Sequence, residues 1–260
     1  MAAELKSTSH GRTLVLTLSN PGLRNALGPE MYAAGFEALS AAENNPDVGS
    51  IIFTGEDGVF CAGGNLQRIQ ANRLQDPAIQ AQSIEGLHDW IEAIRHFPKP
   101  VMAAVEGAAA GAGFSLALAC DLMVAASDAV FVMAYTSVGL SPDGGSSWAL
   151  SRLLPRQLAT HLMLTGERIS APRLHELGVV NQLSAPGSAL STALELAERL
   201  NARAGNALGS VKELVNAASN HSLHEHLKLE RDHFVKNLHH PNAGIGIEAF
   251  LNKATPRYQR

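Results

Sequence analysis

The feature that most constrains the fold of this chain is a strand-to-helix corner that carries almost no side chains. In VEGAAAGAGFSLALACD, residues 105–121, seven consecutive residues are glycine or alanine, and apolar residues stand on both sides of them. This pattern is typical of a buried strand that runs directly into an apolar helix. The first N–H groups of such a helix have no partner within it, and glycine and alanine let a ligand approach them closely. Tight packing of helix on strand would explain the same pattern without a ligand.

Strands and helices alternate along most of the chain, which predicts an α/β protein with a largely parallel sheet. Strands are predicted at residues 13–21 and in VGSIIFTGE, VMAAVEG, DLMVAAS, AVFVMA and VVNQLS, and helices over residues 28–42, 67–96, 146–154 and 156–165 and from the corner to about Cys120. From Ala189 onward the chain is predicted to be helical, with breaks near Asn206, Asn220 and HHPNAG. We therefore expect a core over residues 1–200 and a helical region over residues 201–260.

Composition narrows the function classes. The 260 residues carry a net charge of −4, so no basic surface for nucleic acid or anionic membranes is expected. The two cysteines, Cys61 and Cys120, form neither a disulfide framework nor a CxxC pair, which favours a reducing compartment. No signal peptide or membrane span is evident in the sequence. A cytoplasmic location is the expectation.

The corner does not match two phosphate-binding motifs. A P-loop requires a lysine that does not follow Gly113, and a dinucleotide fingerprint requires a glycine where Leu116 stands. GFSLA and GSSWA are each one residue away from the nucleophile elbow GxSxG, so Ser115 could be an esterase or thioesterase nucleophile with His161 or His175 as base. The remaining hypothesis is an oxyanion hole, which needs two backbone donors. The loop FCAGGNL, after an earlier strand, could supply the second N–H group.

Five blocks of the sequence resemble, in order, the motifs of the crotonase or enoyl-CoA hydratase/isomerase superfamily. They are FCAGGNL, VMAAVEGAAAGAGFSLALACDLMVAA, GLSPDGGSSWALSRLLP, LTGERISAPRLHELGVVNQL and GIEAFLNKATPRY, and together they extend over about residues 13–258. Within this superfamily, the stretch VGLSPDGG is most similar to the epoxyphenylacetyl-CoA isomerases of phenylacetate metabolism.

The resemblance implies a spiral of ββα units whose C-terminal helices build trimers or hexamers. It also implies a coenzyme A thioester as substrate and no metal, flavin or nicotinamide cofactor. The thioester oxygen would accept hydrogen bonds from the backbone N–H groups of Gly64 and Ala112. Coenzyme A would contact Arg24, Ala26, Ala62, Asn65, Leu66, Phe250 and Lys253. Asn65 replaces the usual aspartate of the first loop, a change that we expect to matter little if the loop acts through its backbone.

The two glutamates that catalyse hydration in the family are absent. Ser115 and Tyr135 occupy the matching positions, and the nearest carboxylate is Asp143, which matches the acid/base position of the isomerases. An unperturbed phenol is a poor base, whereas one carboxylate suffices to move a proton between two carbons of an enolate. We therefore predict proton transfer through Asp143, in isomerisation or hydration of an unsaturated acyl-CoA, with Tyr135 as a hydrogen-bond or proton donor. A thioesterase or a binding subunit without activity stays open.

Other residues carry weaker predictions. His88 and Trp90 are candidates to line the acyl pocket, Glu106 is expected to pair locally, and Cys61 is expected to be a small buried residue. Four histidines, His221, His224, His226 and His233, lie in one stretch, with His221 and His224 placed i, i+3 on one predicted helix. A subunit-facing helix is favoured there over a metal site, because no HExxH motif or cysteine accompanies them.

Overall fold

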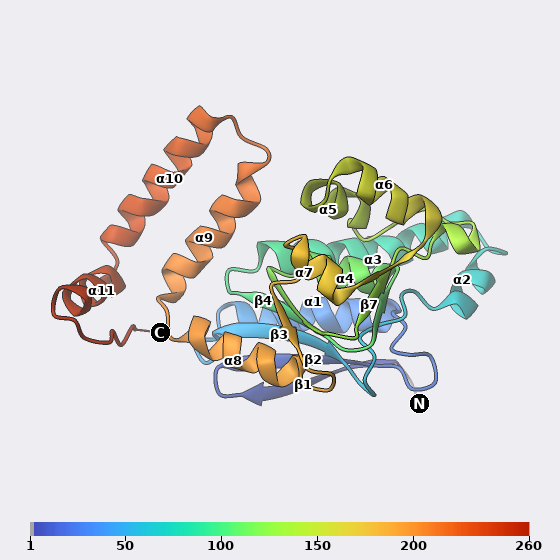
Figure 1. Cartoon of the computed structure of the whole chain (residues 1–260), viewed down its shortest axis with the longest axis horizontal. Helices are drawn as coiled ribbons and strands as arrows, with labels where there is room; N and C mark the ends of the chain where they lie inside the picture. Colours follow the sequence, from blue (N-terminus) through green and yellow to red (C-terminus); the bar gives the residue numbers. More distant parts are fainter. Residues whose placement is uncertain (1–2, 260) are drawn as a thin grey trace.

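The computed structural model describes residues 3–259, and the strands in this range form two sheets (Figure 1). The larger sheet has the order β1 (Glu4–His10), β2 (Thr13–Ser19), β3 (Ser50–Gly55), β4 (Val101–Val105), β6 (Leu122–Ala126) and β9 (Gln182–Ser184). β1 pairs antiparallel with β2, and every later pair is parallel. The mostly parallel sheet confirms the predicted α/β class. β1 was not predicted, because ELKSTSH is polar and forms an exposed edge strand.

The smaller sheet holds β5 (Ala108–Ala110), β7 (Val130–Val132) and β8 (Arg168–Ser170). β5 lies inside the glycine/alanine run, so the predicted direct step from strand to helix is wrong: a second short strand intervenes. β4 is thus followed by β5 and then by α4 (Ala112–Ala119). After β3, Cys61 forms a single bridge to Ala109 of β5 before the next helices begin. These successive ββα units confirm the spiral fold.

Helices cover both faces of the larger sheet. α1 (Pro29–Glu43), α3 (Pro77–His96) and α4 share one hydrophobic core with the alternate strand residues Leu16, Ile51 and Phe53. α8 (Ala189–Asn201) packs its alanines on the opposite face, against Val15 and Ile52. Successive side chains along β2 and β3 point to opposite faces of the sheet and therefore belong alternately to the two cores. The sheet is therefore enclosed between helices, as a parallel sheet requires.

Shorter helices complete the core. They are α2 (Leu66–Asn72), the 3₁₀ turn η1 (Thr136–Val138), α5 (Ser146–Leu153), α6 (Arg156–Thr165) and α7 (Ala171–Glu176). The single helical stretch predicted over residues 67–96 is wrong, because it divides into α2 and α3. Asp76 caps α3 by accepting from the N–H of Ala78, and Pro77 occupies the first turn, so the chain restarts a helix there.

The C-terminal helices α9 (Gly205–Ala218), α10 (Leu223–Leu238) and α11 (Pro241–Leu251) extend away from the sheet and its covering helices (Figure 1). Large apolar side chains are exposed along them, including Val215, Leu223, Phe234 and Phe250. The division at residue 200 stays a prediction, although α8 packs on the sheet and α9 does not follow it there.

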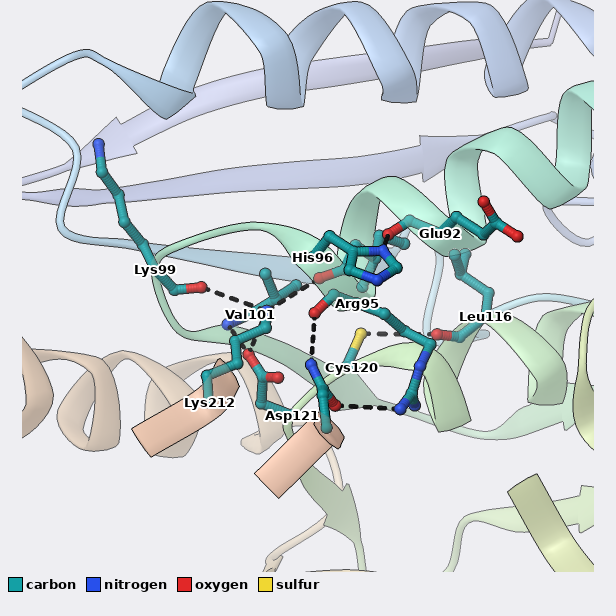
Figure 2. Close-up of polar contacts among 11 residues, drawn as sticks. Glu92, Arg95, His96, Lys99, Val101, Leu116, Cys120, Asp121 and Lys212 are labelled. Carbon is teal, nitrogen blue, oxygen red and sulfur yellow. Dashed lines mark hydrogen bonds and ion pairs between the residues drawn. The ribbon is translucent and has the colours of Figure 1, made fainter. Parts of the chain in front are cut away.

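α9 is anchored to the core by a partly buried ion pair. Nζ of Lys212 lies 2.8 Å from Oδ2 of Asp121 (Figure 2). It also donates to the carbonyl of Ile94 at 2.9 Å. One turn further along α9, Asn216 exchanges hydrogen bonds with Arg95 of α3. Burial raises the pKa of Asp121 and lowers the pKa of Lys212, and each partner's charge opposes those shifts. Both charges therefore depend on each other for stabilisation.

The histidine-rich stretch differs from its prediction in one respect. His221 precedes α10, whose N-cap is Ser222, so His221 and His224 do not share a helix. Ser222 and Glu225 form a capping box, which fixes the start of the helix. Between residues 3 and 259, no group of three or more His, Cys, Asp or Glu side chains is placed to hold a metal ion. Within the same range, no helix combines the length and apolar character needed to cross a bilayer.

Candidate active site

Two backbone loops meet at the start of α4. Cys61 N–H donates to the carbonyl of Ala108, and Ala110 N–H donates to the carbonyl of Cys61, which ties the first loop to β5. A Cβ atom on Gly113 would lie 2.6 Å from the carbonyl oxygen of Cys61, so no side chain fits there. At Gly63, which has φ +99°, a Cβ atom would lie 2.8 Å from the carbonyl oxygen of Ala110. The bare corner thus has a first explanation in close packing of two loops.

The same packing leaves two N–H groups without a protein acceptor. The N–H of Leu27 donates to the carbonyl of Gly63, and the N–H of Asn65 donates to the carbonyl of Leu27. In this parallel bridge the N–H of Gly64, the residue between them, makes no hydrogen bond to Leu27. Ala112 is the first residue of α4, where N–H groups have no intrahelical partner. Neither N–H group donates a hydrogen bond within the described residues. Both line one small cavity of about 30 Å³.

The residues predicted to contact coenzyme A in the first half of the chain come together beside this cavity. The N–H of Ala62 donates to the carbonyl of Arg24 at 2.9 Å, which joins the segment around Arg24 to the loop FCAGGNL. Asn65 is the N-cap of α2 and accepts from the N–H groups of Gln67 and Arg68. Asparagine caps a helix as well as aspartate does, which accounts for its presence.

Asp143 belongs to a hydrogen-bonded cluster with both residues at the glutamate positions. Tyr135 donates from its hydroxyl to Oδ1 of Asp143 at 2.6 Å, and Ser115 donates to the backbone carbonyl of Asp143 at 3.0 Å. The hydroxyl oxygens of Ser115 and Tyr135 lie 3.3 Å apart. A Cβ atom on Gly111 would lie 3.6 Å from the Tyr135 ring, so the cluster adjoins the start of α4. Asp143 also lines the cavity that Gly64 and Ala112 share.

Tyr135 has one role in this cluster. Burial, and next the negative charge of Asp143, raise the pKa of Tyr135 well above its usual range. The phenol therefore stays protonated and serves as a hydrogen-bond donor to the carboxylate rather than as a base. No described residue donates to Oδ2 of Asp143, so this oxygen is available to accept a proton.

The rest of the cavity wall comes from Leu27 and Gly28 and from the helices α1, α2 and α3. On α3 the lining residues Gln80, Ser83, Ile84 and Leu87 follow helical spacing. The predicted pocket residue Trp90 is wrong: its ring is fully buried in the core, 5.5 Å from the ring of Phe53. His88 is likewise absent from the wall, and its side chain is 41% exposed. The sequence indicated the correct helix but the wrong residues on it.

Comparison with known proteins identifies the family. A model of the enoyl-CoA hydratase/isomerase family matches residues 9–260. The chain belongs to that family. It is 35% identical over 250 residues to the 1,2-epoxyphenylacetyl-CoA isomerase of Escherichia coli strain K12, with 94% of each chain covered. It is 30% identical over 257 residues to the 2,3-dehydroadipyl-CoA hydratase of the same organism, with 99% of each covered.

A solved structure described as an enoyl-CoA hydratase from Polaromonas sp. JS666 is 68% identical and superposes with a TM-score of 0.97, over 98% of this chain and 99% of that one. The protein is thus an enzyme of the enoyl-CoA hydratase/isomerase family, with an acyl-CoA hydratase or isomerase function.

The serine-nucleophile hypothesis does not fit this hydratase/isomerase. Ser115 is 1% exposed and lies within α4, not on the sharp turn of a nucleophile elbow. Neither proposed base reaches it: His161 pairs with Glu167, and His175 contacts the carbonyl of Val180. Burial raises the pKa of Cys61 to about 12, so this thiol is not a nucleophile either.

Glu106 has a structural role in the hydratase/isomerase. Its carboxylate accepts from the N–H groups of Gly187 and Ala189 at the start of α8. The expected local pairing is therefore wrong, because these partners lie more than 80 residues along the chain. A carboxylate at a helix N-terminus stabilises that helix.

Phe250 and Lys253 do not reach the cavity within one chain. Phe250 is 84% exposed near the end of α11, and α11 and α2 lie at opposite ends of the molecule (Figure 1). A larger cavity of about 1060 Å³ is lined by residues of the C-terminal helices and of the core. It contains neither of these residues nor any other predicted site residue.

Proposed function

We propose that this enzyme isomerises an unsaturated acyl-CoA by moving a proton between carbons of a thioester enolate, with Asp143 as the acid/base. The observation that carries the proposal is the Ser115–Tyr135–Asp143 cluster. At both glutamate positions stand hydroxyl groups that hold the one carboxylate at the cavity. The similarity to 1,2-epoxyphenylacetyl-CoA isomerase agrees with isomerisation. Syn hydration, by contrast, calls on two carboxylates in the family.

In the proposed mechanism the thioester oxygen lies between the N–H groups of Gly64 and Ala112. As a proton leaves the α or γ carbon, negative charge develops on that oxygen, and the two N–H groups and the N-terminus of α4 stabilise it. The free Oδ2 of Asp143 accepts the proton and returns it to the other carbon. The double bond shifts, and the carboxylate is regenerated. This reaction requires no redox step, so we propose that no cofactor is needed beyond the coenzyme A of the substrate.

We further propose that the enzyme acts as a homo-oligomer, a trimer or a hexamer. Phe250 and Lys253 cannot contact coenzyme A beside Arg24 and Leu66 of their own chain, whereas the C-terminal helices of a second copy could bring them there. The exposed apolar side chains of α9 to α11 support such contacts. Sedimentation of the wild type and of Phe250→Asp tests this, because a charge on an apolar interface should dissociate the oligomer.

Solvent deuterium exchange tests the proposed reaction. The wild type, Asp143→Asn and a matched control, Asp128→Asn on an exposed turn, are incubated with straight-chain and aromatic acyl-CoAs in D₂O. We expect exchange at the α or γ carbon in the wild type and control and its loss in Asp143→Asn. Exchange that survives in Asp143→Asn would refute the assignment. Release of free coenzyme A thiol without exchange would instead indicate a thioesterase, and binding without either reaction a binding subunit.

A further inference from the structure

The phenol of Tyr32 faces the same cavity as Asp143, and no step of the proposed mechanism uses it. Tyr32 lies on α1 and is 8% exposed. It lines the cavity together with Gly64, Ala112 and Asp143. Its hydroxyl makes no hydrogen bond to any described residue. The ring is buried and the residue lines the cavity, so the hydroxyl is free to donate to a polar ligand atom that binds there.

The ring of Tyr32 is held firmly, so its hydroxyl has a defined position. A Cβ atom on Gly86 would lie 3.7 Å from the ring, and the centroid of the Trp90 ring is 6.3 Å away. Trp90 is itself fixed between Phe53 and Gly35 in the core. Burial, and next the charge of Asp143, raise the pKa of Tyr32, so the phenol stays protonated and can donate a hydrogen bond.

A second polar group stands on the same wall. Oε1 of Gln80 accepts from the side-chain amide of Asn72 at 2.8 Å, which orients the Gln80 amide and leaves its N–H₂ group without a described acceptor. Ser83 lies one turn further along α3 and also lines the cavity. A pocket for a plain hydrocarbon chain needs none of these donors, and a hydrocarbon bound there would leave them unpaired.

We propose that Tyr32 is a specificity-determining residue that donates a hydrogen bond to an oxygen atom on the acyl group. The enzyme would thus prefer acyl-CoA thioesters whose acyl group carries an oxygen substituent over hydrocarbon analogues of the same size. This inference rests on the proposed function in one respect, namely that the acyl group binds next to the N–H groups of Gly64 and Ala112 and to Asp143.

Calorimetric binding of phenylacetyl-CoA and its 2-, 3- and 4-hydroxy derivatives tests the inference. For wild type, at least one hydroxy derivative should bind about tenfold more tightly than phenylacetyl-CoA, the value of one good hydrogen bond. Tyr32→Phe should abolish that preference and leave phenylacetyl-CoA binding unchanged or tighter. Tyr258→Phe, a tyrosine outside the cavity, is the matched control and should retain the preference.

Two outcomes would overturn the inference: no preference in the wild type, or a Tyr32→Phe variant that weakens all four ligands equally while its thermal midpoint is unchanged. If Tyr32→Phe unfolds early, wild-type binding of the 2-, 3- and 4-methyl derivatives is measured instead: these lack the acceptor oxygen and should show no tenfold gain, and a gain equal to that of the hydroxy derivatives would overturn the inference. Because binding needs no turnover, the result is independent of the deuterium-exchange test. Loss of exchange in Asp143→Asn and loss of preference in Tyr32→Phe can therefore occur separately, and each bears on its own proposal.

Discussion

The hydroxyl of Tyr135 lies 2.6 Å from Oδ1 of Asp143, and this hydrogen bond holds the proposed acid/base at the cavity. Ser115 supports the arrangement by donating to the backbone carbonyl of Asp143. Two residues thus hold Asp143, Ser115 at its backbone and Tyr135 at its carboxylate. The other oxygen of that carboxylate accepts from no described residue, and it is the atom that takes the proton in the proposed mechanism.

Removal of this hydrogen bond should slow the reaction. Hydrogen bonds to charged groups contribute about 1.5–3 kcal/mol, so we expect Tyr135→Phe to lower kcat by roughly 10- to 100-fold. KM should change little, because the ring and its packing remain. The measurement is kcat and KM between about pH 6 and about pH 9, on the substrate that the exchange experiment identifies. Tyr258→Phe is the control, and a Tyr135→Phe variant with wild-type kcat at every pH would contradict the positioning role.

The close approach of the two loops makes Gly113 indispensable. A methyl group at this position would lie 2.6 Å from the carbonyl oxygen and 2.7 Å from Cβ of Cys61. Gly113→Ala should therefore push the N–H groups of Gly64 and Ala112 apart. Loss of one such donor costs about 100- to 1000-fold in kcat, and we expect a loss of that order. Steady-state kinetics of Gly113→Ala measure it.

Gly205→Ala provides the comparison for that substitution. A Cβ atom there meets nothing within 4 Å, so the variant should retain wild-type activity. Overpacking at Gly113 also costs about 1–3 kcal/mol of stability, so urea unfolding is measured in parallel. Folded Gly113→Ala with unchanged kcat would mean that the loop spacing is not needed for catalysis.

Removing one partner of the ion pair that anchors α9 should destabilise the protein. The side chains of Lys212 and Asp121 are only 10% and 24% exposed. Lys212→Met leaves the Asp121 carboxylate without its counter-charge, and we expect a loss of roughly 3 kcal/mol in the free energy of unfolding. Adding Asp121→Asn should recover part of this loss, because the second charge is then removed as well. Urea denaturation of both variants and of the exposed-site control Lys228→Met measures the effect, and a Lys212→Met cost equal to the control would refute it.

Burial of Cys61 gives the stability a defined pH dependence. Burial raises the pKa of this thiol from 9.0 to about 12, so the folded state retains its proton where the unfolded state has lost it. Stabilisation from the protonated thiol is complete below about pH 9 and declines as pH rises from there to about 12. The free energy of unfolding of wild type minus that of Cys61→Ser should fall by about 1.4 kcal/mol per pH unit above about pH 9. A difference that stays flat up to about pH 10.5 would contradict this burial effect.

The local elements of this protein follow closely from its sequence. Apolar runs such as SIIFTG and VMAAV predicted strands that the structure confirms, because short β-rich runs bounded by glycine or proline have few other stable conformations. The glycine/alanine corner and the loop FCAGGNL indicated two backbone donors, since only residues without side chains allow such close approach. The five motifs and their order along the chain were sufficient to identify the family.

Tertiary packing decided which apolar residues face the cavity and where the short strand β5 forms, because the hydrophobic pattern of the sequence does not specify either. Along α3, Leu87 and Trp90 are both apolar and one turn apart, yet Leu87 lines the cavity and Trp90 fills the core against Gly35 and Phe53. Helical spacing alone does not distinguish them, because the elements packed against α3 determine which of its side chains are buried in the core and which line the cavity. In the same way, β5 formed within a run of alanines because β7 lay beside it.

The cluster of Ser115, Tyr135 and Asp143 also depends partly on the sequence and partly on the tertiary structure. Sequence alone determined that Ser115 and Tyr135 stand where the family has glutamates and that Asp143 is the nearby carboxylate. Only the tertiary structure decided that all three hydrogen-bond to one another and that Tyr32, on a different helix, faces the same cavity. The physical reason is that hydrogen bonds act over about 3 Å in space, whereas the chain separates these residues by several elements of structure whose packing sets their distances.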